Sequence, residues 1–416
     1  MSDTLYYVAT VKEIQSPTSY QPYRQASSVM AISNSLKEAI ISTKPVQGLT
    51  HNFYRYPARF SPEFARQAIL AFTKPFDCVI DPFVGGGTTL VESLALGRHA
   101  IGIDVNSLAY FTSLVKTTPL SSNDIESVLQ WAQRVEEIEP VGAIDDSARQ
   151  PEWLVNMPPD IAKFLVEASR LTADLRFPRQ RRFARCALIR SGQLTLDCQS
   201  RIPSIDEVKT TFGRLLRNMI AGLNEFVTVA QSNDIPKNKI TSMRQIFLGS
   251  TAGSVIDKIQ SLTTAKPTLV LTSPPYPGIH VLYNKWQILG RRETITHYRL
   301  AELKDGHGES FYTMGGRKQR GSDIYFETLF QALVNLRKLV SPSAIVVQLV
   351  AFPDEEFLRS RYLSTMNQAG FDPLDSSNSG ISDCITRMVP NRRWYAYYHE
   401  KQGSSRETLM IHRVRN

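Results

Sequence analysis

The sequence predicts an α/β protein with a doubly wound parallel sheet, a closing antiparallel hairpin and a helical inserted lobe. Residues 76–80 form an apolar run typical of a buried strand, and a glycine-rich turn follows it. After the turn come a helical pattern, which Gly97 closes, and a second strand that ends at Asp104. This succession is the nucleotide-binding half of a doubly wound, Rossmann-like sheet.

The other regions follow from composition and periodicity. Residues 1–50 are polar and predict an N-terminal arm with a short helix near 35–41, whereas residues 51–119 hold the first half of the sheet. Residues 120–240 place apolar side chains at three- and four-residue steps, and they are too many for a link between neighbouring strands. We therefore expect them to form a helical insertion beside the sheet.

Residues 241–416 are expected to complete the sheet. They contain apolar runs of strand length, one helical pattern and two late runs that predict the closing hairpin. The expected strands are 245–248, 268–271 and 344–350, the helix is 325–339, and the hairpin pairs 393–398 with 408–413.

The turn from Asp81 to Thr89 indicates a cofactor other than a dinucleotide. Its glycines allow the backbone to approach a ligand closely, but Gly85-Gly86-Gly87 does not have the Gly-x-Gly-x-x-Gly spacing of pyrophosphate binders. The carboxylate of Asp81 would also repel a pyrophosphate. A cofactor with a cationic centre and an amino-acid tail fits better, and S-adenosylmethionine is such a cofactor. Asp104 would then accept hydrogen bonds from two ribose hydroxyls.

A second motif, Ser273-Pro274-Pro275-Tyr276, follows the apolar run that ends at Thr272. Two prolines hold the backbone extended and have no N–H groups, so that nearby carbonyl oxygens are left as acceptors. A tyrosine ring offers a flat face on which a planar group can stack. The motif therefore suits an exocyclic amino group that acceptors hold while its ring is stacked, as methylation of a base nitrogen requires.

Three blocks of the sequence resemble the amino-directed DNA methyltransferases, which include restriction-modification enzymes. Phe83–Gly87 resembles the Phe-x-Gly-x-Gly cofactor loop of that family. Thr272–Tyr276 resembles its catalytic tetrapeptide, in the serine form usual in cytosine-N4 enzymes. His51–Phe60 resembles the block that precedes the cofactor loop, with Arg59 where lysine is common. The resemblance implies a Rossmann-like methyltransferase sheet and site-specific methylation of DNA.

The same resemblance assigns roles to individual residues. The catalytic residues would be Ser273, Pro274, Pro275 and Tyr276, with the hydroxyl of Ser273 and the carbonyl of Pro274 accepting from the amino group of a cytosine that is flipped out of the duplex. S-adenosylmethionine would supply the methyl group. The cofactor-binding residues would be Phe60, Asp81, Phe83, Gly85, Gly87, Thr88, Thr89 and Asp104.

Two basic segments are candidates for contact with double-stranded DNA. One lies in the helical insertion and interleaves arginines with aromatic residues, a composition that suits phosphate contact and stacking. The other is the glycine-rich loop region 277–323, which directly follows the catalytic motif. The candidate DNA-binding residues are Arg179, Arg181, Arg182, Arg291, Arg292, Arg317, Lys318 and Arg320.

Composition is consistent with this interpretation. The chain has 416 residues and a formal net charge of +9, which favours a polyanionic partner. Its four cysteines are far apart and form no Cys-x-x-Cys pair, so the sequence predicts neither zinc nor a disulfide framework. Without a membrane-length apolar run or a secretory signal, we expect a cytoplasmic protein.

Alternative functions remain open from the sequence. Methylation of the adenine N6 amino group uses the same fold and almost the same loop, although adenine enzymes usually carry Asp or Asn where this chain has Ser273. An RNA methyltransferase and a non-catalytic DNA-binding protein are further alternatives. Carbon-5 cytosine methylation is disfavoured because no cysteine follows a proline. A restriction nuclease or defence-system subunit is a possible partner.

Overall fold

The computed structural model describes most of the chain. The described residues are 29–42, 46–56, 60–139, 152–262, 265–277, 285–289, 292–304, 312, 314–315, 319–352, 356–374, 385–388 and 406–415. Most of the predicted N-terminal arm and residues 393–398 of the predicted hairpin lie outside these ranges. Within them, no helix has the length and apolar character that crossing a membrane requires.

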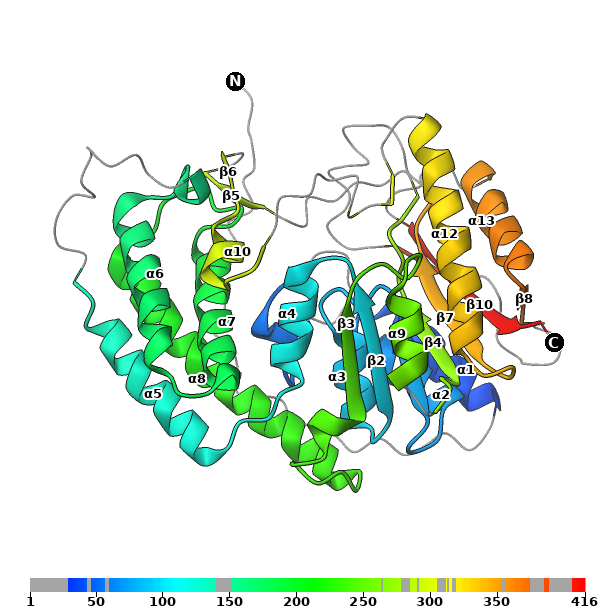
Figure 1. Ribbon diagram of the computed structural model, residues 1–416, viewed down its shortest axis with the longest axis horizontal. Coiled ribbons are helices and arrows are strands. Elements are labelled where there is room, and N and C mark those ends of the chain that lie inside the picture. The colour runs from blue at the N-terminus through cyan, green and yellow to red at the C-terminus, as the bar shows by residue number, and fades with distance from the viewer. Residues whose placement is uncertain are drawn as a thin grey trace.

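In the described part of the chain, one large sheet forms the centre of the molecule (Figure 1). Its strands run in the order β3-β2-β1-β4-β7-β10-β8, and β9 pairs with β10. The strands are β1 (Cys78–Asp81), β2 (His99–Asp104), β3 (Arg244–Leu248), β4 (Leu269–Thr272), β7 (Ile345–Val350), β8 (Phe371–Pro373), β9 (Thr386–Met388) and β10 (Arg406–Val414).

Five neighbouring strands of this sheet run parallel to one another, namely β3, β2, β1, β4 and β7. The chain moves outward from β1 through β2 to β3, and then returns to the other side of β1 as β4 and β7. The direction of winding therefore reverses between β1 and β4. In a doubly wound sheet, ligands bind at the carboxyl ends of the strands beside this point. The strand order and direction confirm the predicted α/β, doubly wound Rossmann-like sheet.

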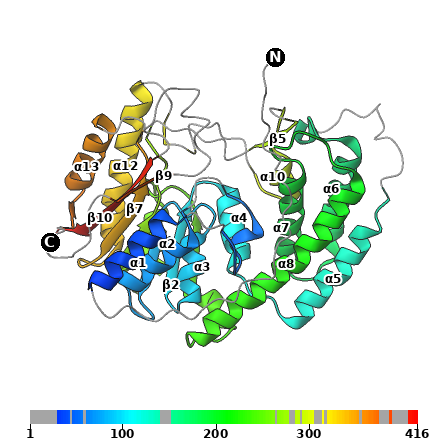
Figure 2. The same ribbon diagram turned by 180° about the vertical axis from the view of Figure 1, so that it is seen from behind.

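Helices cover both faces of the sheet, because side chains along each strand alternate between the two faces (Figures 1 and 2). Cys78, Ile80 and Val270 pack in a core cluster with one helix group, whereas Val79 and Leu269 pack in another with the opposite group. The first group is α9 (Val255–Leu262), α12 (Gln319–Leu339) and α13 (Phe357–Gln368), and the second is α1 (Val29–Ile41) and α2 (Pro62–Phe72), beside which lies α3 (Thr88–Ala95).

A helical lobe lies beside the β3 edge of the sheet (Figure 1). It contains α5 (Ser122–Glu136), α6 (Pro159–Leu171), α7 (Pro178–Thr195) and α8 (Ile205–Ser232). Short 3-10 helices occur at His51–Phe53, Glu152–Leu154, Thr172–Asp174 and Ile240–Met243. Capping boxes at Ser121/Asp124 and Ser204/Glu207 begin α5 and α8, because each serine hydroxyl accepts from the backbone while the acid accepts in return.

The lobe and the sheet share one continuous hydrophobic core. Leu90 of α3 and Phe111 of α4 (Ser107–Lys116) belong to the same buried cluster as Phe183 of α7 and Phe226 of α8. Helix α8 contacts α3, and α7 contacts α4. The lobe is therefore packed against α3 and α4, the two helices that follow β1 and β2.

A late segment of the chain also joins the lobe. The two-stranded sheet of β5 (Trp286–Ile288) and β6 (Arg292–Thr294) is followed by α10 (Thr296–Leu300), which contacts α6 and α7. A methyl group added at Gly192 of α7 would lie 2.5 Å from the Trp286 ring, so the absence of a side chain there makes this packing possible. The described residues between 286 and 300 of the second predicted basic segment thus belong to the same lobe as α7.

Strand β10 is antiparallel to β7, β8 and β9, and it lies between β7 and β8. The predicted strand at 408–413 is therefore correct, and its partners among the described residues are these three strands.

Candidate active site

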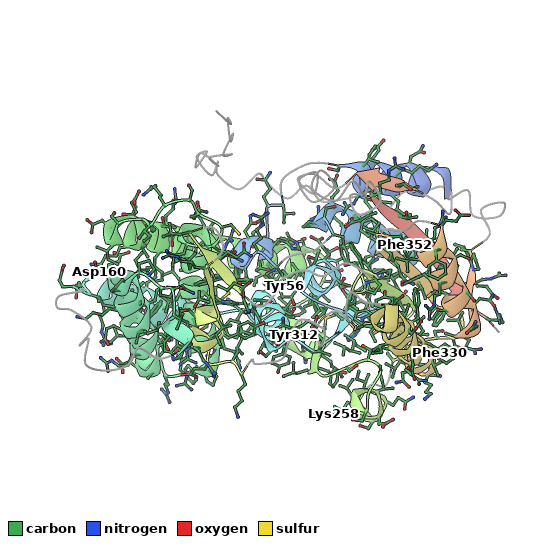
Figure 3. The ribbon with its side chains drawn as sticks, turned by 90° about the horizontal axis from the view of Figure 1, so that it is seen from above. Tyr56, Asp160, Lys258, Tyr312, Phe330 and Phe352 are labelled. Atoms are coloured by element: carbon green, nitrogen blue, oxygen red, sulfur yellow. The ribbon has the colours of Figure 1, made fainter. Side chains whose placement is uncertain are left out.

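A cavity of about 540 Å³ opens at the carboxyl ends of the parallel strands, at the point where the winding reverses. Figure 3 looks onto this side and shows Tyr56 and Tyr312, which both line the cavity, near the middle of the molecule. Four strand ends contribute to the walls: Pro82, Phe83 and Gly85 after β1, Asp104 and Val105 at β2, residues 249–252 after β3, and Ser273–Tyr276 after β4.

The glycine turn needs its glycines for two reasons. Gly85 and Gly87 have φ values of +46° and +76°, which side chains rarely tolerate. A methyl group at Gly87 would also lie 2.7 Å from the hydroxyl of Ser113 in α4, and one at Gly86 would lie 2.9 Å from Cβ of Tyr56. The turn is thus packed tightly between Tyr56 and α4.

Buried Lys116 fixes the same turn. Its Nζ donates to the carbonyl of Gly86 at 2.6 Å and lies 3.5 Å from the carbonyl of Tyr54, and the side chain is 1% exposed. An ammonium group needs such acceptors when it is removed from water. This contact has no local signal in the sequence, because Lys116 ends a helix thirty residues after Gly86.

His51, which belongs to the block before the glycine turn, contacts α3, the helix that follows β1. Its Nε2 lies 2.7 Å from Oε1 of buried Glu92 in α3, and Arg66 of α2 donates to both oxygens of the same carboxylate. Burial would raise the pKa of Glu92, yet the charges and hydrogen bonds of Arg66 and His51 lower it below its ordinary value. This network fixes the segment of His51 against α2 and α3. Residues 57–59 of the block lie outside the described residues.

Asp104 is the acid at the cavity wall. Its two carboxylate oxygens accept the N–H groups of Gly85 and Asn106, both at 2.8 Å. Burial raises the pKa of Asp104 to about 6, and these backbone hydrogen bonds oppose the shift. Each oxygen of a carboxylate can accept two hydrogen bonds. Asp104 therefore keeps capacity for two hydroxyl donors while it holds the glycine turn.

Asp81, by contrast, does not line the cavity and is buried, with 2% of its surface exposed. Oδ1 accepts the Thr272 hydroxyl at 2.6 Å and the Phe83 N–H at 3.1 Å, and Oδ2 accepts the Thr89 hydroxyl at 2.6 Å. Burial raises its pKa to about 6, although these donors oppose the shift. The carboxylate thus joins the glycine turn, the start of α3 and the strand that leads into Ser273.

The other predicted cofactor residues divide into two groups. Phe83 and Gly85 line the cavity, as Asp104 does. Phe60 packs edge-on against Phe64 in the core cluster of α1 and α2. The remaining residues, Gly87, Thr88 and Thr89, form the start of α3. Neither Phe60 nor Asp81 nor these three belong to the cavity lining among the described residues.

The Ser273–Tyr276 loop is anchored at its far end. The hydroxyl of Tyr276 donates to Oε1 of Glu407 at 2.7 Å, and the hydroxyl of Tyr325 in α12 donates to the carbonyl of Pro275 at 2.7 Å. Burial raises the pKa of Tyr325 well above its ordinary value, so this donor keeps its proton.

The near end of the loop is available to a ligand. Ser273 is partly exposed at the cavity, and neither its hydroxyl nor the carbonyl of Pro274 has a partner among the described residues. These two acceptors lie beside the ring of Tyr276 in sequence, and all three residues line the cavity. The structure therefore leaves unengaged the two groups that were predicted to hold an amino group.

The predicted DNA-binding arginines of α7 are largely engaged within the protein. Arg179 donates to Asp124 at 2.7 Å and stacks over the ring of Phe177, and Arg181 donates to the carbonyl of Leu175 at 3.0 Å. Arg182 is partly buried, and burial lowers the pKa of its guanidinium. Arg185, its neighbour on the helix, pairs with Glu302.

The second predicted DNA segment is described only in part. Arg292 is exposed on β6. Arg291, Arg317 and Lys318 lie outside the described residues, as does the side chain of Arg320, whose backbone belongs to α12.

Several cavity residues were not predicted from the sequence. Gly249–Ala252 follow β3, and Thr251 donates to the carbonyl of Pro82 at 2.8 Å. Tyr56 could have been found, because it belongs to the block that resembles the family. The others come from distant parts of the chain: Val105, Tyr312, Met314, Gly315, Ile324, Thr328 and Ala332.

A family model described as DNA methylase matches residues 12–113, about a quarter of the chain. The matched range contains the glycine turn and Asp104, and it ends before the Ser273–Tyr276 loop. Methyltransferases of this family use S-adenosylmethionine as their methyl donor.

Two curated relatives match over short ranges. Type II methyltransferase M.MvaI of Kocuria varians is 38% identical over 84 residues, which cover 20% of this chain and 18% of that protein. DNA adenine methyltransferase YhdJ of Escherichia coli is 37% identical over 62 residues, which cover 15% of this chain and 21% of that protein. The chain thus spans about a fifth of the length of these relatives.

Among solved structures, TrmN from Thermus thermophilus aligns with 85% of this chain and 48% of its own length. The sequence identity is 10% and the TM-score is 0.31. The fold assignment therefore depends on the strand order and directions of the sheet.

Proposed function

We propose that this protein transfers a methyl group from S-adenosylmethionine to the exocyclic N4 amino group of a flipped-out cytosine in double-stranded DNA. One observation carries the proposal: a single cavity is lined by the glycine turn with Asp104 and by the Ser273–Tyr276 loop. A cofactor held by the first set of residues and a base held by the second would lie next to each other.

The cofactor side of the cavity fits S-adenosylmethionine. The volume of about 540 Å³ falls within the range of about 300–1,000 Å³ that is usual for small-molecule sites. Asp104, with acceptor capacity left on both oxygens, suits the two ribose hydroxyls. When bound, the cofactor supplies an electrophilic methyl group.

The base side of the cavity supplies acceptors and a stacking surface. The lone pair of a cytosine amino group is conjugated with its ring, and it becomes available when the nitrogen turns from planar toward tetrahedral. The Ser273 hydroxyl and the Pro274 carbonyl would accept the two amino hydrogens and so favour that change. Tyr276 would stack on the base. Because these groups are already positioned, alignment of the reactants supplies much of the rate.

Adenine N6 is the second candidate target. The matched relative from Escherichia coli bears the name of a DNA adenine methyltransferase, so an adenine enzyme occurs among proteins of this similarity. Ser273 favours cytosine, because the family resemblance associates serine at this position with cytosine-N4 enzymes.

Double-stranded DNA is the proposed partner on account of the net charge of +9 and the helical lobe beside the β3 edge of the sheet. Arg182 of α7 and exposed Arg292 of β6 are the described arginines that we assign to phosphate contact. A cytoplasmic location and a cognate nuclease or defence-system subunit stay predictions.

The proposal is tested by incubating the protein with unmethylated DNA and labelled S-adenosylmethionine, and then identifying the labelled nucleoside by mass spectrometry. N4-methylcytosine is the expected product. Ser273→Ala should slow transfer by roughly 10- to 100-fold, because it removes one hydrogen bond to a developing charge. Ser261→Ala is the matched control, since Ser261 is an exposed serine of α9 outside the cavity lining and its variant should transfer at the wild-type rate.

Labelled N6-methyladenine would agree with the proposed mechanism but contradict cytosine as the target base. Label in RNA alone would overturn the DNA substrate. Cofactor binding without transfer to either nucleic acid would contradict the proposed activity.

A further inference from the structure

Glu407 is a buried acid that contacts the proposed catalytic loop from a distant part of the chain. It lies on β10, is 3% exposed, and its Oε1 accepts the hydroxyl of Tyr276 at 2.7 Å. The loop of Tyr276 follows β4, and β7 lies between β4 and β10 in the sheet. The hydrogen bond therefore spans the end of the intervening strand and joins residues 131 positions apart.

The other oxygen of Glu407 is held equally firmly. Oε2 accepts Nε of Arg387 at 2.8 Å and Nη2 at 2.5 Å, and these two residues are opposite each other in the β9–β10 pair. Nη1 of Arg387 in turn lies 3.4 Å from the carbonyl of Ile40, near the end of α1. The carboxylate is thus fixed by a second strand and, through the arginine, by a helix.

This arrangement constrains the Tyr276 ring in particular. The hydroxyl lies at the tip of the ring, so an immobile acceptor there fixes the direction of the side chain. A phenol hydrogen also prefers the plane of its ring, so an acceptor at one side limits rotation of the ring about its long axis. A charged acceptor makes this hydrogen bond stronger than a neutral one would. Tyr325 fixes the adjacent Pro275 carbonyl, so that backbone and ring are held by separate contacts.

We propose that Glu407, with Arg387 behind it, is a positioning residue that holds the Tyr276 ring in the orientation in which it stacks on the target base. The inference rests on the function proposed above. Glu407 has no assigned contact with cofactor or base and acts through Tyr276. Its loss should therefore slow methyl transfer and leave cofactor affinity unchanged.

The first experiment measures ring orientation without DNA. In protein labelled with ¹³C in the tyrosine rings, the Tyr276 signal is identified by its absence in Tyr276→Phe. Glu407→Gln should shift or broaden that signal, because it removes the charged acceptor and weakens the pair with Arg387. Asp372→Asn is the control, since it breaks a different carboxylate–arginine pair, with Arg415 at the end of β10, and should leave the signal unchanged.

The second experiment measures single-turnover methyl transfer to DNA. We expect Glu407→Gln to lower the rate about tenfold while the Kd for S-adenosylmethionine stays within about twofold of wild type. In the Tyr276→Phe background, Glu407→Gln should cause no further loss, because Tyr276→Phe has already removed the hydrogen bond that Glu407→Gln weakens. Asp372→Asn should transfer at the wild-type rate.

The outcomes separate the two proposals. An unshifted Tyr276 signal in Glu407→Gln overturns the positioning role, whatever the activity. The positioning role is also overturned if the double variant is slower than Tyr276→Phe by the full factor that Glu407→Gln causes alone, because Glu407 would then act by another route. If the wild-type protein transfers no methyl group to nucleic acid but the Tyr276 signal shifts, the proposed function fails while the contact between Glu407 and the ring stands.

Discussion

Helix α7 and the loop after β4 both carry residues that suit nucleic acid, but they differ in what the protein already does with them. On α7, the guanidinium of Arg179 contacts Asp124, and that of Arg181 contacts the Leu175 carbonyl. In the loop, the Ser273 hydroxyl and the Pro274 carbonyl have no partner among the described residues, although Pro275 and Tyr276 beside them are firmly bonded.

This difference separates residues that build the fold from residues that are prepared for a ligand. A polar group at a cavity that keeps unused acceptor capacity can bind a ligand without breaking a contact of the protein. A guanidinium that already pairs with a buried carboxylate would have to give up that pair. A high density of arginine in the sequence is therefore weaker evidence for a binding surface than two unengaged acceptors in a rigid loop.

Asp104 and Asp81 differ in the same way, since one has acceptor capacity left for a ligand and the other does not. The largest effect of a substitution is expected at Asp104. Asp104→Asn keeps the size of the side chain but replaces one acceptor oxygen with an NH₂ group. The single oxygen left cannot accept the N–H groups of Gly85 and Asn106 and also two ribose hydroxyls. We expect the Kd for S-adenosylmethionine to rise roughly 100-fold, which corresponds to about 2.7 kcal/mol. Isothermal titration calorimetry measures this directly. Asp257→Asn, a change at an exposed acid of α9, should bind as wild type does, and equal affinity of both variants would break the comparison.

Asp81 should behave in the opposite way, because its oxygens are taken up by Thr89, Thr272 and the Phe83 N–H. Asp81→Leu removes this acceptor from the Thr272 hydroxyl and the Phe83 N–H, and leaves the Thr89 hydroxyl only the Leu271 carbonyl at 3.2 Å. We expect the free energy of unfolding to fall by roughly 2 kcal/mol. Asp81→Asn retains an acceptor and should bind S-adenosylmethionine with nearly wild-type affinity. A tenfold weaker affinity in Asp81→Asn would instead support Asp81 as one of the cofactor-binding residues that the sequence resemblance implied.

The pH dependence sharpens the same test. Burial raises the pKa of Asp81 from 3.8 to about 6, so between these values the folded protein binds more protons than the unfolded chain. The contribution of Asp81 to stability is therefore full below about pH 3.8 and is lost as the pH rises through about 6. Asp81→Asn does not titrate. Its stability relative to wild type, measured by urea unfolding, should rise between pH 4.5 and pH 7.5, and a difference that is flat with pH would contradict the raised pKa.

The smallest effects are expected among the arginines. Arg292→Ala removes an exposed charge on β6 and should weaken DNA binding a few-fold. The slope of log affinity against log salt concentration should become less steep by about the amount that one phosphate contact contributes. Arg179→Ala should leave DNA affinity unchanged and reduce stability by at most about 1 kcal/mol, because its pair with Asp124 is partly exposed. Binding titrations at several salt concentrations decide the matter, and equal losses of affinity in both variants would remove the distinction between paired and exposed arginines.

The fold could be predicted largely because its signals are local. Apolar runs and the glycine turn marked β1, β2, β4 and β7, and the length of the helical stretch marked the insertion. The placement of single polar groups could not be predicted in the same way. The contacts of Asp81 with Thr272 and of Tyr276 with Glu407 join residues 191 and 131 positions apart, and strand order, which sequence periodicity does not encode, brings them together. The pair of Arg179 with Asp124 joins α7 to α5 across 55 positions, and helical periodicity does not indicate which helices pack together.

The position of β10 has a consequence for how the protein is made. Residues 406–414 come after β8 in the chain but lie between β7 and β8 in the sheet, and Glu407 is among them. On the ribosome, the earlier strands emerge well before the strand that must pair with β7 and β8. The edge of β7 therefore waits unpaired, open to pairing with other chains, until this segment emerges. The ring of Tyr276 gains its acceptor at the same moment, so a chain still in synthesis has its glycine turn long before it has a finished site.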